Sequence, residues 1–106
     1  GHPTGRLLNR RAGLELDYGR IAAAAADAGT ALEVNANPHR LDLSGTGVRA
    51  AVDAGAVVVV NTDAHAPAEL DYVRYGVHTA RRGWAESTGV LNTWRASDVR
   101  SFLEDG

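Results

Sequence analysis

The stretch Val57-Val58-Val59-Val60-Asn61-Thr62-Asp63-Ala64-His65 joins four consecutive valines directly to a carboxylate and an imidazole. A run of β-branched residues that follows a glycine and ends in polar residues is typical of a strand buried on both faces, in a parallel sheet covered by helices. In such folds, ligands bind beyond the carboxyl ends of the strands. We therefore expect Asp63 and His65 to lie at a functional site.

The Asp-x-His triplet offers one carboxylate oxygen and one imidazole nitrogen. These donors suit Mn, Zn or Fe, so Asp63 and His65 are candidate metal ligands. The same triplet also has a plain structural interpretation, in which Asp63 caps the next helix and His65 lies on its surface. The triplet alone does not decide between the two.

Composition narrows the classes of function. With 106 residues and 44% hydrophobic content, the chain forms one domain at most. Eleven basic against 13 acidic residues give a net charge of −2, so any phosphate contact must be local. The absence of Cys leaves His, Asp and Glu as metal ligands. We find no secretory signal and no apolar run near the ~20 residues of a membrane span, so we expect no membrane association, and a cytoplasmic protein.

Capping and terminating residues divide the chain into alternating strands and helices. The expected strands are Ala31–Asn35 and Val57–Val60. The expected helices are Tyr18–Ala28 (capped by Asp17, ended by Gly29), Gly47–Ala54 (ended by Gly55), Pro67 to about Arg82, and one that starts at Ala96-Ser97-Asp98. Residues 84–94 are expected to be irregular with one helical turn. This alternation indicates α/β architecture with parallel βα units and right-handed crossovers.

The chain opens at Gly1-His2-Pro3 without the strand that we expect to lead into it. Counting that strand, three parallel strands are too few for a closed barrel, which needs about 250 residues. A sheet of three strands would also leave both edges unpaired. The chain is then either a small flavodoxin-like sheet or part of a larger domain, and we favour the second.

Polar residues follow each of these strand ends. The first end gives His2, the second gives Glu33 and Asn35, and the third gives Asp63 and His65. Because the carboxyl ends of parallel strands share one rim, these residues are expected to converge. Each also has an ordinary interpretation: a loop histidine, a surface carboxylate or a turn asparagine.

Several segments resemble a known family. They are His2-Pro3-Thr4-Gly5-Arg6-Leu7-Leu8, Leu32-Glu33-Val34-Asn35-Ala36-Asn37-Pro38, Arg40-Leu41-Asp42-Leu43, Thr62-Asp63-Ala64-His65, Val73-Arg74-Tyr75-Gly76-Val77, Ala80-Arg81-Arg82-Gly83-Trp84 and Leu91-Asn92-Thr93. Together they are similar to the C-terminal part of the PHP (polymerase and histidinol phosphatase) domain of bacterial and archaeal family X DNA polymerases. The resemblance covers nearly all of residues 1–106.

This resemblance implies the C-terminal portion of a distorted seven-stranded (β/α) barrel. In such a barrel up to three divalent ions, Mn or Zn, lie at the C-terminal rim and serve phosphoester hydrolysis. By motif, His2, Asp63 and His65 match metal ligands, while Glu33 and Asn35 match a segment that lines the site. The family's other ligands belong upstream of this chain, so we expect the chain alone to be inactive.

The polymerase branch implies 3′-5′ exonuclease and 3′-phosphatase action on DNA ends in DNA repair, with a polymerase module in the same polypeptide. Arg6 and Arg40 follow rim residues, and their guanidinium groups can grip a substrate phosphate or form plain surface ion pairs. His39 and His78 are expected to be surface residues. A PHP phosphatase of a small metabolite such as histidinol phosphate, and a non-catalytic scaffold, remain alternatives.

Overall fold

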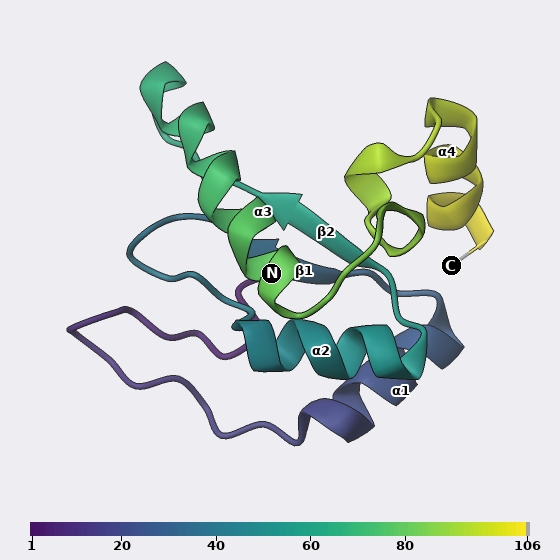
Figure 1. Cartoon of the computed structure of the whole chain (residues 1–106), viewed down its shortest axis with the longest axis horizontal. Helices are drawn as coiled ribbons and strands as arrows, with labels where there is room; N and C mark the ends of the chain where they lie inside the picture. Colours follow the sequence, from purple (N-terminus) through teal and green to yellow (C-terminus); the bar gives the residue numbers. More distant parts are fainter. Residues whose placement is uncertain (106) are drawn as a thin grey trace.

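The computed structural model of this chain describes residues 1–105 and is built around two parallel strands (Figure 1). Strand β1 (Leu32–Asn35) pairs with β2 (Val58–Asn61), so that Leu32 lies opposite Val58 and Asn35 opposite Asn61. The predicted α/β class and the parallel pairing are confirmed. The described sheet has two strands, and its place in a larger barrel stays a prediction.

Helices follow the strands much as predicted. Their bounds are α1 (Tyr18–Ala28), α2 (Gly45–Ala54), α3 (Val73–Arg82) and α4 (Ala96–Asp105). Asp17 caps α1 by accepting a hydrogen bond from the Arg20 N–H at 3.2 Å, and Gly29 ends the helix with a left-handed φ of 66°. In residues 1–105 no helix is long and apolar enough to cross a bilayer.

Three helical segments differ from the prediction, and each strand begins one residue later than expected. Helix α2 begins two residues earlier than expected, because Ser44 caps it by accepting a hydrogen bond from the Gly47 N–H at 3.3 Å. The single helix expected from Pro67 is a 3-10 helix (Pro67–Tyr72) followed by α3. The irregular segment after α3 contains two 3-10 turns, Ser87–Gly89 and Leu91–Thr93, where one helical turn was expected.

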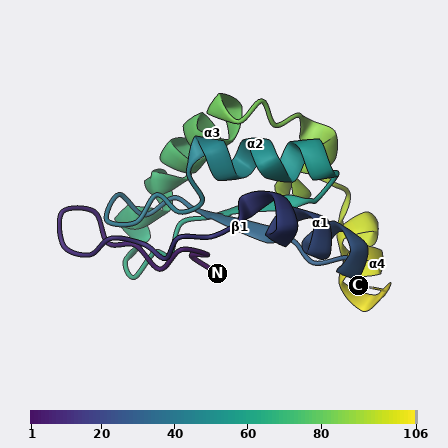
Figure 2. The same cartoon turned by 90° about the horizontal axis from the view of Figure 1, so that it is seen from below.

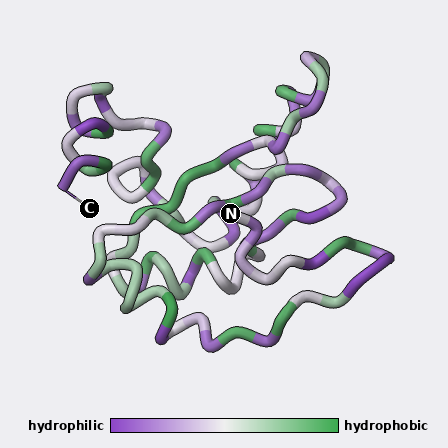
Figure 3. Tube along the Cα trace, turned by 180° about the vertical axis from the view of Figure 1, so that it is seen from behind, coloured by the Kyte–Doolittle hydropathy of each residue, from purple (hydrophilic) through white to green (hydrophobic). Residues whose placement is uncertain are grey.

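Helices α2 and α3 cover one face of the sheet, as Figure 2 shows. Val58 and Val60 are buried in this core, with 1% and 6% exposure, whereas Val59 on the other face is only half-buried. The hydrophobic stretch along β2 is visible in Figure 3. Within residues 1–105 helices pack on one face of the sheet, so the expected burial of β2 on both faces is not seen in this chain.

Short segments cover both edges of the sheet. Beside β2, the Asn92 amide pairs with the backbone of Val60: its Oδ1 accepts from the Val60 N–H at 2.8 Å and its Nδ2 donates to the Val60 carbonyl at 2.9 Å. Beside β1, Asp42 forms an antiparallel bridge with Asn35. The expectation that a small sheet would leave its edges unpaired is therefore wrong, because loop residues replace the missing strands.

Helix α3 packs closely against the sheet at Gly76, and a substitution there tests this packing. A Cβ atom there would lie 2.4 Å from Val60 Cγ1 and 2.9 Å from Ala36 Cβ. Helix propensity alone favours Gly76→Ala by about 1 kcal/mol, but overpacking costs about 1–3 kcal/mol. We expect Gly76→Ala to lower the melting temperature. The matched variant Gly19→Ala in α1, where only Asp17 comes within 4 Å of the added Cβ, should raise it. A more stable Gly76→Ala protein would contradict this packing.

Candidate functional site

Polar side chains meet at the carboxyl ends of the two strands. Glu33 Oε1 accepts a hydrogen bond from the backbone N–H of His2 at 2.8 Å. Its second oxygen, Oε2, accepts one from Asn61 Nδ2 at 2.8 Å. Glu33 thereby connects the N-terminal segment with the end of β2, which is the convergence of strand ends that the sequence predicted.

The Asn35 amide joins the two carboxylates of this rim. Its Nδ2 lies 3.2 Å from Glu33 Oε1 and 3.3 Å from Asp63 Oδ2, and its Oδ1 accepts from the Asn37 N–H at 3.0 Å. The residue is only 2% exposed, so these hydrogen bonds form away from bulk water. Asn35 is thus a bridge between two acids.

Hydrogen bonds keep Glu33 in its charged form. Burial acts to raise the pKa of this carboxyl. Hydrogen bonds donated by Asn61, His2 and Asn35 act in the opposite direction and outweigh burial. The pKa of Glu33 is therefore lowered from its ordinary value of 4.5, and the rim carries a negative charge at neutral pH.

Asp63 and His65 lie just beyond β2. Asp63 has a left-handed φ of 54°, and its Oδ2 lies beside Asn35. His65 Nδ1 is 2.9 Å from the Asp63 carbonyl oxygen, which can only accept, so Nδ1 carries a proton and, in the neutral imidazole, Nε2 has a free lone pair. The alternative in which Asp63 caps the next helix is wrong, because Ala66 occupies that position.

His2 joins the rim through its backbone. Its backbone is held at both ends, with its N–H on Glu33 and its carbonyl oxygen accepting from the Gly5 N–H at 2.9 Å. Within residues 1–105, no group of three or more His, Asp or Glu side chains is arranged to hold one ion. The ligand roles of His2, Asp63 and His65 stay predictions, with the described part of the chain supplying an incomplete donor set.

The two arginines singled out from the sequence have different surroundings. Arg6 Nε donates to the Arg40 carbonyl at 2.8 Å, and Arg6 Nη2 donates to the Leu41 carbonyl. Arg40 Nη1 donates to the Arg6 carbonyl at 3.4 Å, while Arg40 Nε lies 3.9 Å from Asp63 Oδ2. Arg6 therefore ties two loops together, and Arg40 reaches the rim itself.

Sequence reasoning missed the role of Asp42, which is completely buried. Its Oδ2 accepts three hydrogen bonds, from Thr4 N–H and Thr4 Oγ1 at 2.9 Å and from Gly5 N–H at 3.0 Å. In residues 1–105 its other oxygen, Oδ1, has no partner. The position of Asp42 between Leu41 and Leu43 was the available signal, since a carboxylate among apolar neighbours needs donors from elsewhere.

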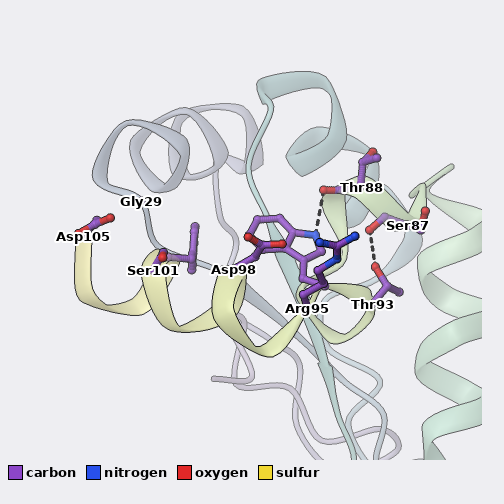
Figure 4. Close-up of a pocket in the computed structure, with 10 residues that line it drawn as sticks. Gly29, Ser87, Thr88, Thr93, Arg95, Asp98, Ser101 and Asp105 are labelled. Carbon is purple, nitrogen blue, oxygen red and sulfur yellow. Dashed lines mark hydrogen bonds between the residues drawn. The ribbon is translucent and has the colours of Figure 1, made fainter.

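Other candidate residues lie away from the rim. His39 and His78 are exposed, as expected. A cavity of about 790 Å³ lies where the end of α1, residues 87–95 and α4 meet (Figure 4). Its Thr93 hydroxyl is engaged with the Ser87 carbonyl at 2.6 Å, and no histidine is among the residues that line it. Asp98 and Asp105 also line it, but the hydrogen bonds that its described side chains form go to backbone carbonyls.

Comparison with known proteins places this chain beside a bacterial enzyme. No family model matches the chain. The chain is similar to the protein named DNA polymerase/3′-5′ exonuclease PolX of Bacillus subtilis (strain 168), with 48% identity over 103 residues. These residues are 97% of this chain and 18% of that protein. The chain thus spans less than a fifth of this relative's length. The identity agrees with the resemblance found in the sequence, and the PHP assignment stays a prediction.

Replacing the bridging amide of Asn35 by a carboxylate tests the network. Asn35→Asp would place an oxygen against both Glu33 and Asp63, and the repulsion should cost about 2–4 kcal/mol of unfolding free energy at pH 7. Because protonation relieves repulsion, this deficit relative to wild type should shrink as the pH falls toward 4, about the ordinary carboxyl pKa. Denaturant unfolding at both pH values measures it. The control Asn37→Asp keeps the acceptor used by the His39 N–H and should change little. Equal stability of both variants would contradict the bridge.

Proposed function

We propose that this chain is the C-terminal part of a metal-dependent phosphoesterase domain that acts on DNA 3′ ends and is attached to a family X DNA polymerase. The similarity to the B. subtilis polymerase/exonuclease along 97% of the chain carries the proposal. The polar rim at the strand ends supports it, because phosphoester chemistry needs a charged site and β/α folds place their sites there. We place its action in the cytoplasm.

The donors at the rim fit divalent cations such as Mn or Zn. His65 Nε2 has a free lone pair, while Nδ1 on a backbone carbonyl fixes the ring, which is the usual arrangement of a metal-binding histidine. Asp63, two residues earlier, would supply a carboxylate oxygen, and His2 would supply a further nitrogen. The complete domain would hold up to three ions with ligands from outside this chain.

Within the proposed site, the residues have different roles. His2, Asp63 and His65 would hold divalent cations, which lower the pKa of water and offset the charge that develops on a reacting phosphoryl group. Glu33 and Asn35 hold the surrounding backbone and carboxylate in place through the hydrogen bonds described above. Arg40 lies at the rim, where its guanidinium can bind a substrate phosphate. No serine or cysteine nucleophile is required.

Asp63→Asn in the full-length protein is the sharpest test, because it keeps the shape of the side chain and removes its charge. If Asp63 is a ligand, Mn-dependent release of nucleotides from a DNA 3′ end should fall by about two orders of magnitude or more, with a near-normal melting temperature. Asp53→Asn on α2, an exposed partner of Arg49, is the matched control and should keep normal activity. Near-normal rates in Asp63→Asn would overturn the proposed site.

The isolated 106-residue chain provides a second test. Its described part holds no group of three candidate ligands, so it should bind Mn or Zn weakly and hydrolyse no phosphoester. Isothermal titration with Mn and an assay with a chromogenic phosphodiester measure both expectations. Metal-stimulated hydrolysis that disappears in His65→Ala would show instead that this chain is catalytically sufficient.

A further inference from the structure

We propose that Asp42 is a positioning residue of the rim, which sets the affinity for a divalent cation by fixing the backbone that carries His2. This inference rests on the proposed function, since it assumes that His2 binds metal. Asp42 is buried and is not one of the polar residues at the strand ends, so its sequence position does not suggest this role.

The first step of the argument is the set of donors on Asp42. All three hydrogen bonds to Oδ2 come from Thr4 and Gly5, two and three residues after His2. Hydrogen bonds to a buried carboxylate are strong and leave little freedom to the donors. Both Thr4, at 6% exposure, and Asp42, at 0%, are shielded from competing water.

The second step is the turn that these hydrogen bonds hold. The Gly5 N–H that contacts Asp42 also donates to the His2 carbonyl at 2.9 Å, and it does so with a left-handed φ of 69° at Gly5. The N–H of His2 is in turn fixed on Glu33. The direction of the His2 side chain is therefore set by a turn whose anchor is Asp42.

The third step is the link from Asp42 to the other half of the rim. Its backbone pairs with that of Asn35 in an antiparallel bridge, with the Asp42 N–H donating to the Asn35 carbonyl at 3.1 Å. Asn35 is the residue whose amide holds Glu33 and Asp63. Asp42 thus connects the turn that begins at His2 with the residue whose amide contacts Asp63.

Thr4 offers a milder test than substitution of Asp42, which is fully buried and whose loss can prevent folding. Thr4→Val keeps the size of the side chain and removes the hydroxyl donor, while Thr4→Ser keeps the donor. In the full-length protein, titration calorimetry with Mn should show about tenfold weaker binding in Thr4→Val. Thr4→Ser should bind Mn as the wild type does. The control Asp17→Ala, which removes the distant cap of α1, should lower the melting temperature and leave Mn affinity unchanged.

A double-mutant cycle with His2→Ala then shows whether the effect passes through His2. If it does, Thr4→Val has no further effect on Mn affinity once His2 is replaced by alanine. Wild-type affinity in Thr4→Val, or a loss that persists in the His2→Ala background, would overturn the positioning role. The second result would show instead that Thr4 acts on Mn affinity by a route other than His2. A wild-type protein that neither binds Mn nor hydrolyses DNA 3′ ends would overturn the proposed function, and this inference with it.

Discussion

The backbone bridge between Asn35 and Asp42 is the interaction on which the rest of the rim depends. From one side of the bridge, the Asn35 amide reaches Glu33 and Asp63. From the other side, the Asp42 carboxylate holds the turn that begins at His2. Because both side chains are buried, each of their hydrogen bonds replaces a contact with water that is lost on folding, and neither residue can relax without exposing the other's partners.

The two faces of the sheet have different surroundings. Val58 and Val60 face α2 and α3, so the stability of the pair of strands comes from that layer. Glu33 and Asn61 alternate with these residues along the strands and occupy the uncovered face with half-buried Val59. In the proposed barrel this face would point to the interior, where side chains of further strands would cover it.

The arginines show how similar residues acquire different functions. Arg6 donates hydrogen bonds to backbone carbonyls of the loop that contains Arg40, and these bonds hold that loop in place. Arg40 lies in the loop that Arg6 holds, and its side chain extends toward Asp63. Both guanidinium groups donate to backbone carbonyls, but Arg40 also lies 3.9 Å from Asp63 Oδ2, and this position favours Arg40 over Arg6 as the phosphate-binding residue of the proposed site.

Local propensity and periodicity were enough to predict the order of strands and helices, the caps of α1 at Asp17 and Gly29, and the polar residues that follow each strand. The sequence alone could not determine that helices cover β2 on one face in this chain, nor the partners of Asp42. Those features depend on which segments meet in space. The sequence shows that Asp42 is a carboxylate between two leucines, which is unusual. Its hydrogen-bond donors, Thr4 and Gly5, lie 38 and 37 positions away in the sequence, and only the tertiary fold brings them to it.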